Sequence, residues 1–231
     1  MKRLSVLAIL FIALTGLLVS MGCKKDKDDE PVVLKDADGN VYTSVVIGTQ
    51  EWMKENLRTT RYRNGDPITH APMVNDWKTV TEGKYCAYDN DGGTVVPYGY
   101  LYSWIAVSDP RHLCPAGWHV ASRADWDTLI GFLGGAYAAG GKLKQTGTTS
   151  WNSVSSGTTN ESGFTALPGG VRNYTSADFF GLSDEGHWWT STENPNNSTM
   201  ADRDYLRAIS DIIQYNPASK NFGFSVRCVK D

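Results

Sequence analysis

The first 22 residues constrain this chain more than any other segment, because they decide the compartment in which it folds. Lys2 and Arg3 form a short basic start, and an apolar run follows over residues 4–19. This is the layout of a secretory signal, and the run is shorter than the roughly 20 apolar residues of a membrane-spanning helix. We therefore expect the mature chain to fold in an oxidising compartment outside the cytoplasm.

The four residues Ser20-Met21-Gly22-Cys23 resemble the cleavage site of bacterial lipoproteins. Gly22 fits that pattern, although Ser20 stands where leucine is usual. The resemblance implies that residues 1–22 form a lipoprotein signal peptide and that Cys23 becomes the lipidated first residue. Two alternatives stay open, namely an ordinary signal peptide followed by an incidental cysteine and an uncleaved N-terminal helix.

After Cys23, residues 24–31 are seven charged residues and one proline. Such a segment cannot bury enough apolar surface to offset its ordering entropy, so we expect residues 23–31 to form a solvated tether. Its acidic end, Asp28-Asp29-Glu30, resembles the surface-export signals of Bacteroidetes lipoproteins, although any lipoprotein needs a polar spacer. We expect a protein anchored through lipid to the bacterial outer membrane and exposed at the cell surface.

Removing residues 1–22 takes away two positive charges and moves the formal net charge from −3 to −5. A mildly acidic chain without a basic patch does not suit nucleic acid, because such binding depends on neutralising phosphates. The remaining 209 residues suffice for one good core or two small ones. Abundant Gly, Trp and Tyr with modest charge favour a loop-rich α+β or all-β domain over a helical bundle.

Lipidation of Cys23 would leave Cys86, Cys114 and Cys228, and therefore three single pairings. We expect a Cys114–Cys228 disulfide, because Cys114 begins one predicted strand and Cys228 lies in the last one. Such a bridge would close a loop of roughly a hundred residues, worth about 4–5 kcal/mol in the chain-entropy description. Three reduced, buried cysteines are the alternative, and the role of Cys86 stays open.

Local patterns predict both strands and a helix. Residues 32–48 read as a β-hairpin with its turn at 36–40. The one clear helix begins at Ser122, whose hydroxyl forms a capping-box pattern with Asp125 three residues later. Apolar residues then recur at helical spacing over 126–133, which predicts one buried face.

The second half of the chain is rich in loops. Residues 140–174 are dominated by Gly, Ser, Thr and Asn, and we expect a loop ordered by the buried anchors Trp151, Phe164 and Leu167. Strands are predicted at 187–193, 204–212 and 223–229. In the last strand, Phe224, Val226 and Cys228 share one face, while Ser225, Arg227 and Val229 take the other. The order of elements indicates an α+β fold.

Eight blocks of the sequence occur together in a fixed order. They are DGNVY (38–42), QEWMKENL (50–57), YGYLYSW (98–104), CPAGWHV (114–120), AGGKLK (139–144), NESGFTALPGG (160–170), WWTSTE (188–193) and GFSVRCV (223–229). Together they resemble the Fibrobacter succinogenes major paralogous domain family, which is common in Bacteroidetes surface lipoproteins. The resemblance implies a C-type lectin-like α+β domain over residues 32–231, with a mixed or antiparallel sheet after an N-terminal β-hairpin. It carries no catalytic residues that could be transferred.

Patterns for metal binding are weak. No HExxH or Cys-x-x-Cys occurs, and the four histidines lack metal-ligand spacing. In the stretch Glu193-Asn194-Pro195-Asn196-Asn197 an asparagine separates Glu from Pro, which departs from the Glu-Pro-Asn loop of calcium-dependent lectins. Asp89 and Asp91 are the other weak metal candidates, since Asp-Gly pairs form turns first. We expect no cofactor, with Ca²⁺ as the alternative.

We expect most of the aromatic residues to pack in the core, and exposed ones would form a binding surface. Exposed rings stack on sugar faces or anchor a protein partner. We select Trp188, Trp189, Glu193, Asn196 and Asn197 as candidate ligand-binding residues. Neighbouring residues of a strand point to opposite faces, so only one of Trp188 and Trp189 can be buried in a one-sided sheet.

The sequence therefore favours a non-enzymatic binding or adhesion module for glycan or protein ligands, without nucleic acid as a partner. Glycan hydrolysis is one alternative, because a glycosidase needs two carboxylates across a cleft and Glu161, Glu185 and Glu193 are available. A purely structural envelope protein is another.

Overall fold

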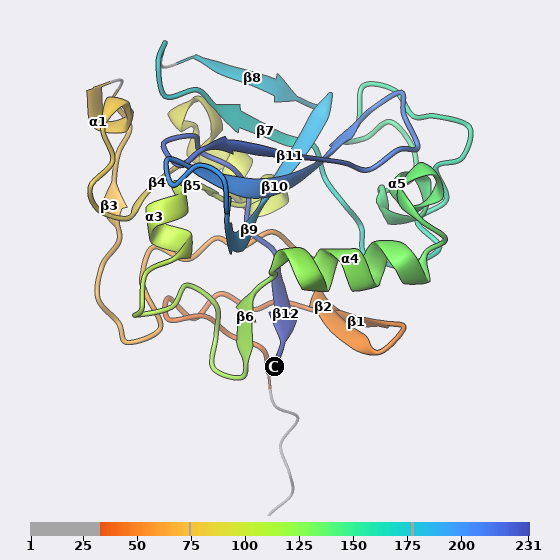
Figure 1. The fold of residues 1–231 in the computed structure, drawn as a ribbon, viewed down its shortest axis with the longest axis horizontal. Helices are drawn as coiled ribbons and strands as arrows, with labels where there is room; N and C mark the ends of the chain where they lie inside the picture. The colour runs from red at the N-terminus through yellow and green to blue at the C-terminus, as the bar shows by residue number, and fades with distance from the viewer. Residues whose placement is uncertain (1–32, 74, 177) are drawn as a thin grey trace, which may run out of the picture. The chain divides into compact units, whose positions relative to one another are not determined.

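The computed structural model describes residues 33–73, 75–176 and 178–231 (Figure 1). The predicted signal peptide, Cys23 and the tether lie outside the described residues. In the part that is described, no helix is long and apolar enough to cross a membrane. The elements in chain order are β1 (Ser44–Ile47), β2 (Gln50–Met53), β3 (Thr69–His70), α1 (Asn75–Lys78), β4 (Lys84–Cys86), two 3₁₀ turns (Tyr88–Asn90 and Gly92–Thr94), α2 (Val95–Tyr98), β5 (Leu101–Tyr102), α3 (Trp104–Val107), β6 (Trp118–Val120), α4 (Arg123–Phe132), α5 (Ala136–Leu143), β7 (Gly169–Arg172), β8 (Phe179–Leu182), β9 (Glu185–Glu193), β10 (Met200–Arg207), β11 (Gln214–Ser219) and β12 (Cys228–Lys230).

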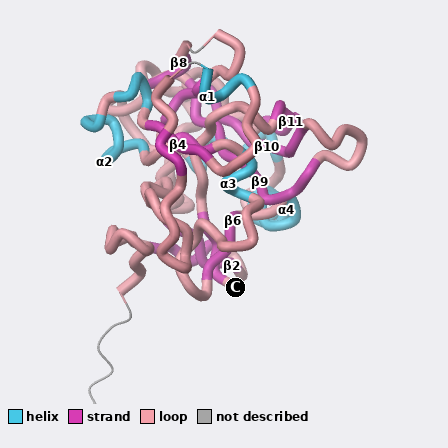
Figure 2. The backbone as a smooth tube through the Cα atoms, turned by 90° about the vertical axis from the view of Figure 1, so that its left-hand side faces the viewer, coloured by secondary structure: helices cyan, strands magenta, loops and turns pink. Residues whose placement is uncertain are grey.

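Four small sheets carry the fold, and the predicted α+β class is confirmed. Their strand orders are β1-β2-β12-β6, β11-β10-β9, β3-β4-β5 and β7-β8. All strand pairs are antiparallel except β3 with β4. Long loops join these short strands (Figure 2). In Figure 1 the β7–β8 hairpin and the four-stranded sheet lie on opposite sides of β10 and β11.

The last strand closes the sheet that the first strands begin. β12 lies between β2 and β6, where Val229 faces Trp52 and Cys228 faces Val120. The predicted Cys114–Cys228 disulfide is confirmed, with the two Cα atoms 6.1 Å apart. Cys86 remains a buried thiol, and burial raises its pKa to about 12.

The predicted alternation over residues 223–229 is confirmed, but only Cys228–Lys230 form the regular strand β12, and both faces are buried. Phe224, Val226 and Cys228 belong to one apolar cluster. Val229 belongs to a second cluster, which contains Trp52 and Trp126. The strand thus separates two halves of the core, and even Arg227 is fully buried.

Arg227 and Asn56 form a polar network inside this core. The Arg227 guanidinium donates to the carbonyls of Met53 (2.9 Å) and Phe164 (2.8 Å) and to Asn56 Oδ1 (2.9 Å). Asn56 Oδ1 also accepts from Trp188 Nε1 (2.8 Å), and Asn56 Nδ2 donates to the Tyr98 carbonyl (2.8 Å). Five of the eight sequence blocks therefore meet at one asparagine and one arginine, which explains why they occur together.

The helix predicted from Ser122 is confirmed as α4. The Ser122 hydroxyl accepts from the Asp125 amide and the Asp125 carboxylate accepts from the Ser122 amide, so the capping box is complete. Trp126 and Leu129 are buried as predicted. A second regular helix, α5, was missed because its Gly140 and Gly141 suggested a loop. A Cβ on Gly140 would lie 2.5 Å from the Asp211 carbonyl oxygen, so a close backbone approach requires glycine here.

The N-terminal hairpin prediction is correct in its turn and wrong in its strands. The Asp36 carboxylate accepts from the amides of Asp38 and Asn40, both at 3.0 Å. The flanking residues make one bridge, Lys35 with Val41. The regular hairpin pairs β1 with β2 and follows that turn.

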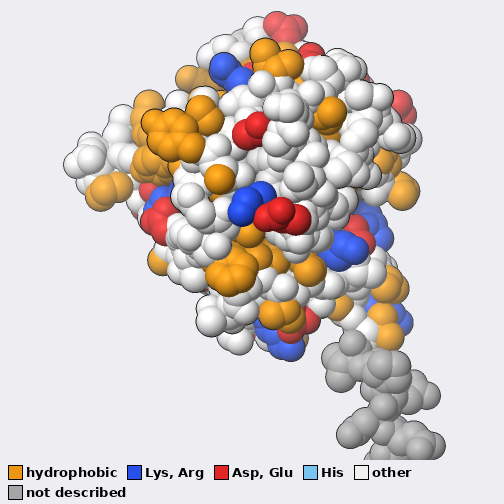
Figure 3. All heavy atoms as spheres, turned by 90° about the vertical axis from the view of Figure 1, so that its right-hand side faces the viewer, with side chains coloured by type: hydrophobic (Ala, Val, Ile, Leu, Met, Phe, Trp, Pro, Cys, Tyr) orange, Lys and Arg blue, Asp and Glu red, His pale blue; other side chains and the backbone are white. Residues whose placement is uncertain are grey.

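The loop after α5 is ordered by buried anchors, as predicted for Trp151 and Phe164. Lys144 is also buried, and its ammonium donates to the carbonyls of Ala208 (2.9 Å) and Ser210 (2.8 Å). These bonds fix the segment that follows β10. The surface carries hydrophobic side chains in separate groups among polar ones, as the face in Figure 3 shows.

Candidate binding site

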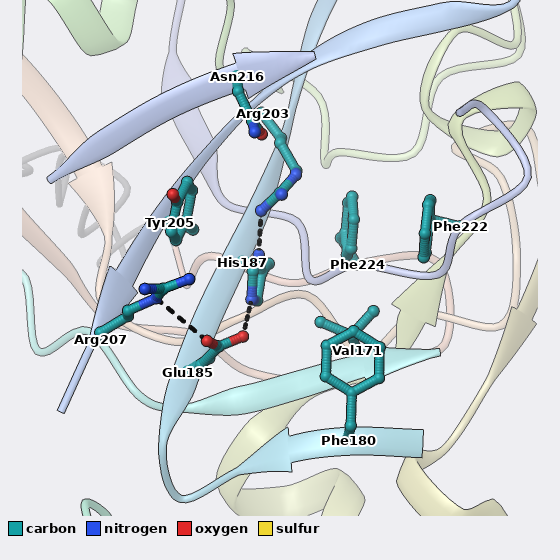
Figure 4. Close-up of a pocket in the computed structure, with 10 residues that line it drawn as sticks. All are labelled: Val171, Phe180, Glu185, His187, Arg203, Tyr205, Arg207, Asn216, Phe222 and Phe224. Atoms are coloured by element: carbon teal, nitrogen blue, oxygen red, sulfur yellow. Dashed lines mark hydrogen bonds and ion pairs between the residues drawn. The ribbon is translucent and has the colours of Figure 1, made fainter. Parts of the chain in front are cut away.

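A cavity of about 290 Å³ lies on the β9–β10–β11 sheet. Figure 4 shows the side chains that line it, namely Val171, Phe180, Glu185, His187, Arg203, Tyr205, Arg207, Asn216, Phe222 and Phe224. They come from β7, β8, β9, β10, β11 and the segment that precedes β12. Phe180 is 43% exposed and Arg207 is exposed, so the cavity is accessible to solvent.

Strand register places the central residues on one face of the sheet. Tyr205 pairs with His187 and Arg207 pairs with Glu185 across β9 and β10. Because side chains alternate along a strand, Arg203 lies on the same face as Tyr205. Asp204 lies on the opposite face, where Arg123 of α4 donates to its carboxylate at 2.6 Å. Burial raises the pKa of Asp204 to about 6.

A row of stacked rings forms the floor of the cavity. The His187 ring stacks on Tyr205, with centroids 5.2 Å apart, and on Phe224, with centroids 5.3 Å apart. Phe222 continues the row beyond Phe224 at 5.4 Å. The interplanar angles are all below 20°. Such a row is rigid, because each ring restricts the rotation of its neighbours.

The hydrogen bonds of His187 define its tautomer. Arg203 Nη1 donates to His187 Nδ1, because a guanidinium has no acceptor. The proton of the neutral ring therefore lies on Nε2, which donates to Glu185 Oε2 at 2.9 Å. The pKa of His187 is lowered to about 4, mainly by burial and also by the Arg203 charge, against the opposing effect of Glu185. His187 is thus neutral at pH 7, with both ring nitrogens engaged.

Glu185 links His187 to the rim of the cavity. Its other oxygen, Oε1, lies 3.2 Å from Arg207 Nε. The hydrogen bond from His187, with the nearby arginines, lowers the pKa of Glu185, so this carboxylate is ionised at pH 7. The Arg207 side chain is 54% exposed and has further donors free of this ion pair.

Arg203 has donors that the described part of the chain does not use. Its guanidinium packs over Tyr205 at 4.6 Å and Phe224 at 5.1 Å. Its Nε is buried and has no hydrogen-bond partner. No carboxylate of the described residues forms an ion pair with it, and burial lowers its pKa. Arg203 is therefore a cation held by aromatic faces and a neutral histidine.

A second cavity of about 210 Å³ adjoins the first. It is lined by Ser153, Asp184, Glu185, Arg207, Ala208 and Ile209. Glu185 and Arg207 line both cavities, so their ion pair stands between the two. The Lys144 bonds to residues 208 and 210 fix one wall of this second cavity.

The structure buries both predicted binding tryptophans, and the expectation that only one can be buried is wrong. Trp188 and Trp189 are each 0% exposed. Their indole nitrogens donate to Asn56 Oδ1 and to the Tyr102 carbonyl, each at 2.8 Å. The sheet is covered on both faces, so neither ring offers a face to a ligand from solvent.

Of the other predicted binding residues, Glu193 ends β9, and Asn196 and Asn197 lie in the turn between β9 and β10. Glu193 forms an ion pair with Lys220 at 2.7 Å. Asn197 Oδ1 accepts from the Thr199 amide at 3.0 Å and shapes the turn, while Asn196 is exposed. None of these side chains lines either cavity.

Asp89 lies in the first 3₁₀ turn, and Asp91 lies between the two turns as the N-cap of the second. The Asp91 carboxylate accepts from the Gly93 amide at 2.8 Å, which is a turn-forming contact. Within residues 33–73, 75–176 and 178–231, no group of three or more His, Cys, Asp and Glu side chains could hold a metal ion.

Sequence reasoning missed most of the cavity. Glu185 was considered only as one of several carboxylates, and Arg203, Tyr205 and Arg207 were not selected. Their spacing of two residues is the strand pattern that could have identified them. The strand predicted at 204–212 contained Tyr205 and Arg207 but not Arg203, because β10 runs from Met200 to Arg207. Apart from Phe224, every lining residue lies outside the eight sequence blocks.

The structure is a mixed α+β domain with a cavity that is lined by aromatic and cationic side chains. Residues 45–230 match the model of the Fibrobacter succinogenes major domain, and the chain belongs to this family. No curated protein and no solved structure matches the chain.

Proposed function

We propose that this protein is a lipid-anchored binding module of the bacterial cell envelope that recognises a glycan or protein ligand without transforming it. The observation that carries the proposal is the cavity on the β9–β10–β11 sheet. It combines a row of aromatic rings with two guanidinium groups and an opening to solvent. Apolar walls with a few convergent polar groups are typical of ligand sites.

The chemistry of the cavity favours binding over hydrolysis. Glycosidases use two carboxylates about 5–10 Å apart. Among the described residues that line the cavity, Glu185 is the only carboxylate, and both of its oxygens are engaged. His187 has no free lone pair in this arrangement, because Arg203 occupies Nδ1. It therefore cannot accept a proton without breaking that contact.

A C-type lectin-like arrangement is part of the proposal. It is supported by β12, which joins the two ends of the described chain in one sheet, and by the disulfide beside it. The long loops and the capped helix α4 agree with the same arrangement.

A glycan array probed with the full-length protein in mild detergent, with and without EDTA, tests the binding function. We expect binding to a subset of glycans that EDTA does not abolish, because the cavity has no cluster of metal-ligating side chains. Loss of binding in EDTA would support a calcium lectin instead. Release of reducing sugar would contradict the non-enzymatic proposal, and no binding to glycans or surface proteins would favour a structural role.

The lipid anchor needs a separate test. Mass spectrometry of the N-terminal peptide should show diacylglycerol on Cys23, and Cys23→Ser should release the protein from the membrane fraction. An unmodified cysteine at this position would contradict the anchor and leave the binding proposal intact.

A further inference from the structure

The charges around the first cavity do not balance. Arg203 and Arg207 carry two positive charges, Glu185 carries one negative charge, and His187 is neutral. The lining therefore has one surplus positive charge. A buried cation is costly unless it is paired, so a ligand that brings a negative charge gains more here than a neutral one.

The surplus charge is concentrated on Arg203 and held in a fixed orientation. The rings of Tyr205 and Phe224 contact its guanidinium, and His187 Nδ1 accepts from one of its nitrogens. Its Nε is buried without a partner among the described residues, so a ligand reaches the guanidinium through its terminal nitrogens. A guanidinium binds a carboxylate through two parallel hydrogen bonds, and prior orientation of the fork reduces the entropy lost on binding.

The rest of the lining suits the other parts of a sugar. Phe180 and Phe222 provide apolar faces, and the exposed amide of Asn216 can exchange hydrogen bonds with hydroxyl groups. A volume of about 290 Å³ lies at the lower end of the range for ligand sites, which suits one compact group. A pyranose ring with one carboxylate fits this combination of apolar, polar and charged groups.

We infer that this cavity binds a sugar that bears a carboxylate, a uronic acid residue, with Arg203 and Arg207 as its carboxylate-binding groups. This inference rests on the proposed binding function and names its ligand class. The Glu185–Arg207 ion pair makes the site selective, because Arg207 turns from Glu185 toward the ligand only when the ligand supplies an equivalent anion. A neutral sugar would leave that ion pair unchanged and Arg203 without an anion.

Calorimetric titration of the full-length protein in detergent tests the inference with three probes. Methyl glucuronide and methyl glucoside differ only at C6, so their comparison isolates the carboxylate, and glutarate provides carboxylates without a sugar ring. We expect the glucuronide to bind about tenfold more tightly than the glucoside, since charge-assisted hydrogen bonds contribute that much. Its affinity should fall as NaCl is raised. Equal affinity for the two glycosides would overturn the inference, and so would tighter binding of glutarate.

Substitutions of the two cavity arginines test whether the glucuronide binds in this cavity. Arg207→Gln removes an exposed charge and should lower glucuronide affinity about tenfold without changing glucoside affinity. Arg203→Lys keeps the charge and loses the fork, and should also lower glucuronide affinity. The matched control is Arg61→Gln, an exposed arginine paired with Asp38 outside the cavity, which should bind as the wild type does. Unchanged glucuronide affinity in Arg207→Gln, with the thermal transition retained, would overturn the inference.

Different results would contradict the proposed binding function and the proposed ligand class. If the array shows binding to neutral glycans or to proteins while the glucuronide does not bind, the ligand class is wrong and the binding function stands. If neither the array nor the titration shows binding, both are wrong.

Discussion

Replacing Arg227 with methionine is expected to destabilise the domain by about 3–5 kcal/mol, the range for breaking a buried charged network by removing one partner. Arg227 is fully buried, and burial lowers its pKa to about 9, which leaves it charged at pH 7. Its guanidinium donates to the carbonyls of Met53, Lys54 and Phe164 and to Asn56 Oδ1. Methionine fills a similar length of space and donates no hydrogen bond.

Two opposing effects determine how much Arg227→Met lowers the free energy of unfolding. Each of the three carbonyls loses a charged donor, at a cost of about 1–3 kcal/mol per buried acceptor. Removal of the guanidinium also removes its desolvation penalty, which is several kcal/mol for a buried ion. The lost hydrogen bonds outweigh this gain, because the acceptors stay buried and come from segments that cannot move apart without opening the core.

Urea unfolding with the disulfide intact measures the difference, provided that circular dichroism and tryptophan fluorescence give the same transition. Arg61→Gln is the control, since an exposed substitution of this kind changes the unfolding free energy by at most about 0.5 kcal/mol. A value for Arg227→Met within 1 kcal/mol of the wild type, which is well below the estimate above, would refute the reasoning and mark the network as dispensable.

Three further predictions concern packing, the disulfide and pH. Gly140→Ala should destabilise by about 1–3 kcal/mol through its clash with a backbone carbonyl, whereas Gly131→Ala in α4, where a Cβ meets nothing within 4 Å, should be neutral or stabilising in the same urea assay. Replacing Cys114 and Cys228 by serine should lower stability by up to about 4–5 kcal/mol, and thiol counting on the wild type should find neither of them free. His187 has a folded-state pKa of about 4, below its unfolded value of about 6.5, so the unfolded state binds the proton first and stability falls as pH drops through this range. Between pH 6.5 and pH 4 the melting temperature of a His187→Gln variant should fall less than that of the wild type. The other titrating groups are the same in both proteins.

The sequence predicts correctly those features that depend on residues close together in the chain. The capping box at Ser122 and Asp125 involves residues three positions apart, and it occurs as predicted. The alternation of Phe224, Val226 and Cys228 is likewise a property of one extended segment, of which only Cys228 belongs to β12. The disulfide could be predicted because the compartment and the cysteine count left few pairings.

The burial of Arg227 and of both tryptophans could not be predicted in the same way. An arginine in an alternating strand reads as a solvent-facing residue, and its partners Asn56 and Phe164 are distant in the sequence. Trp188 and Trp189 are both buried because separate elements cover the two faces of β9, a property of the tertiary structure alone. The acceptors of the hydrogen bonds that Arg227, Trp188 and Trp189 donate lie in other segments of the chain.

The cavity could be predicted from the sequence even less, because its residues come from several segments. His187 and Arg203 meet only because β9 and β10 pair in one register, and a shift of one residue would exchange the cavity face for the face under α4. Phe222 and Phe180 join them from two further segments. The family blocks build the scaffold, and the residues that give the site its chemistry stand mostly between them.

The position of β12 has a consequence for the order of folding under the proposed export. A chain that emerges from a translocation channel N-terminus first presents β2 and β6 well before residues 228–230, which must insert between them. Until then the two strands have no central partner, and Cys114 lacks its native partner Cys228 while the thiol of Cys86 is already present. On the proposed export route, the sheet and the native disulfide are therefore completed only after nearly the whole chain has emerged.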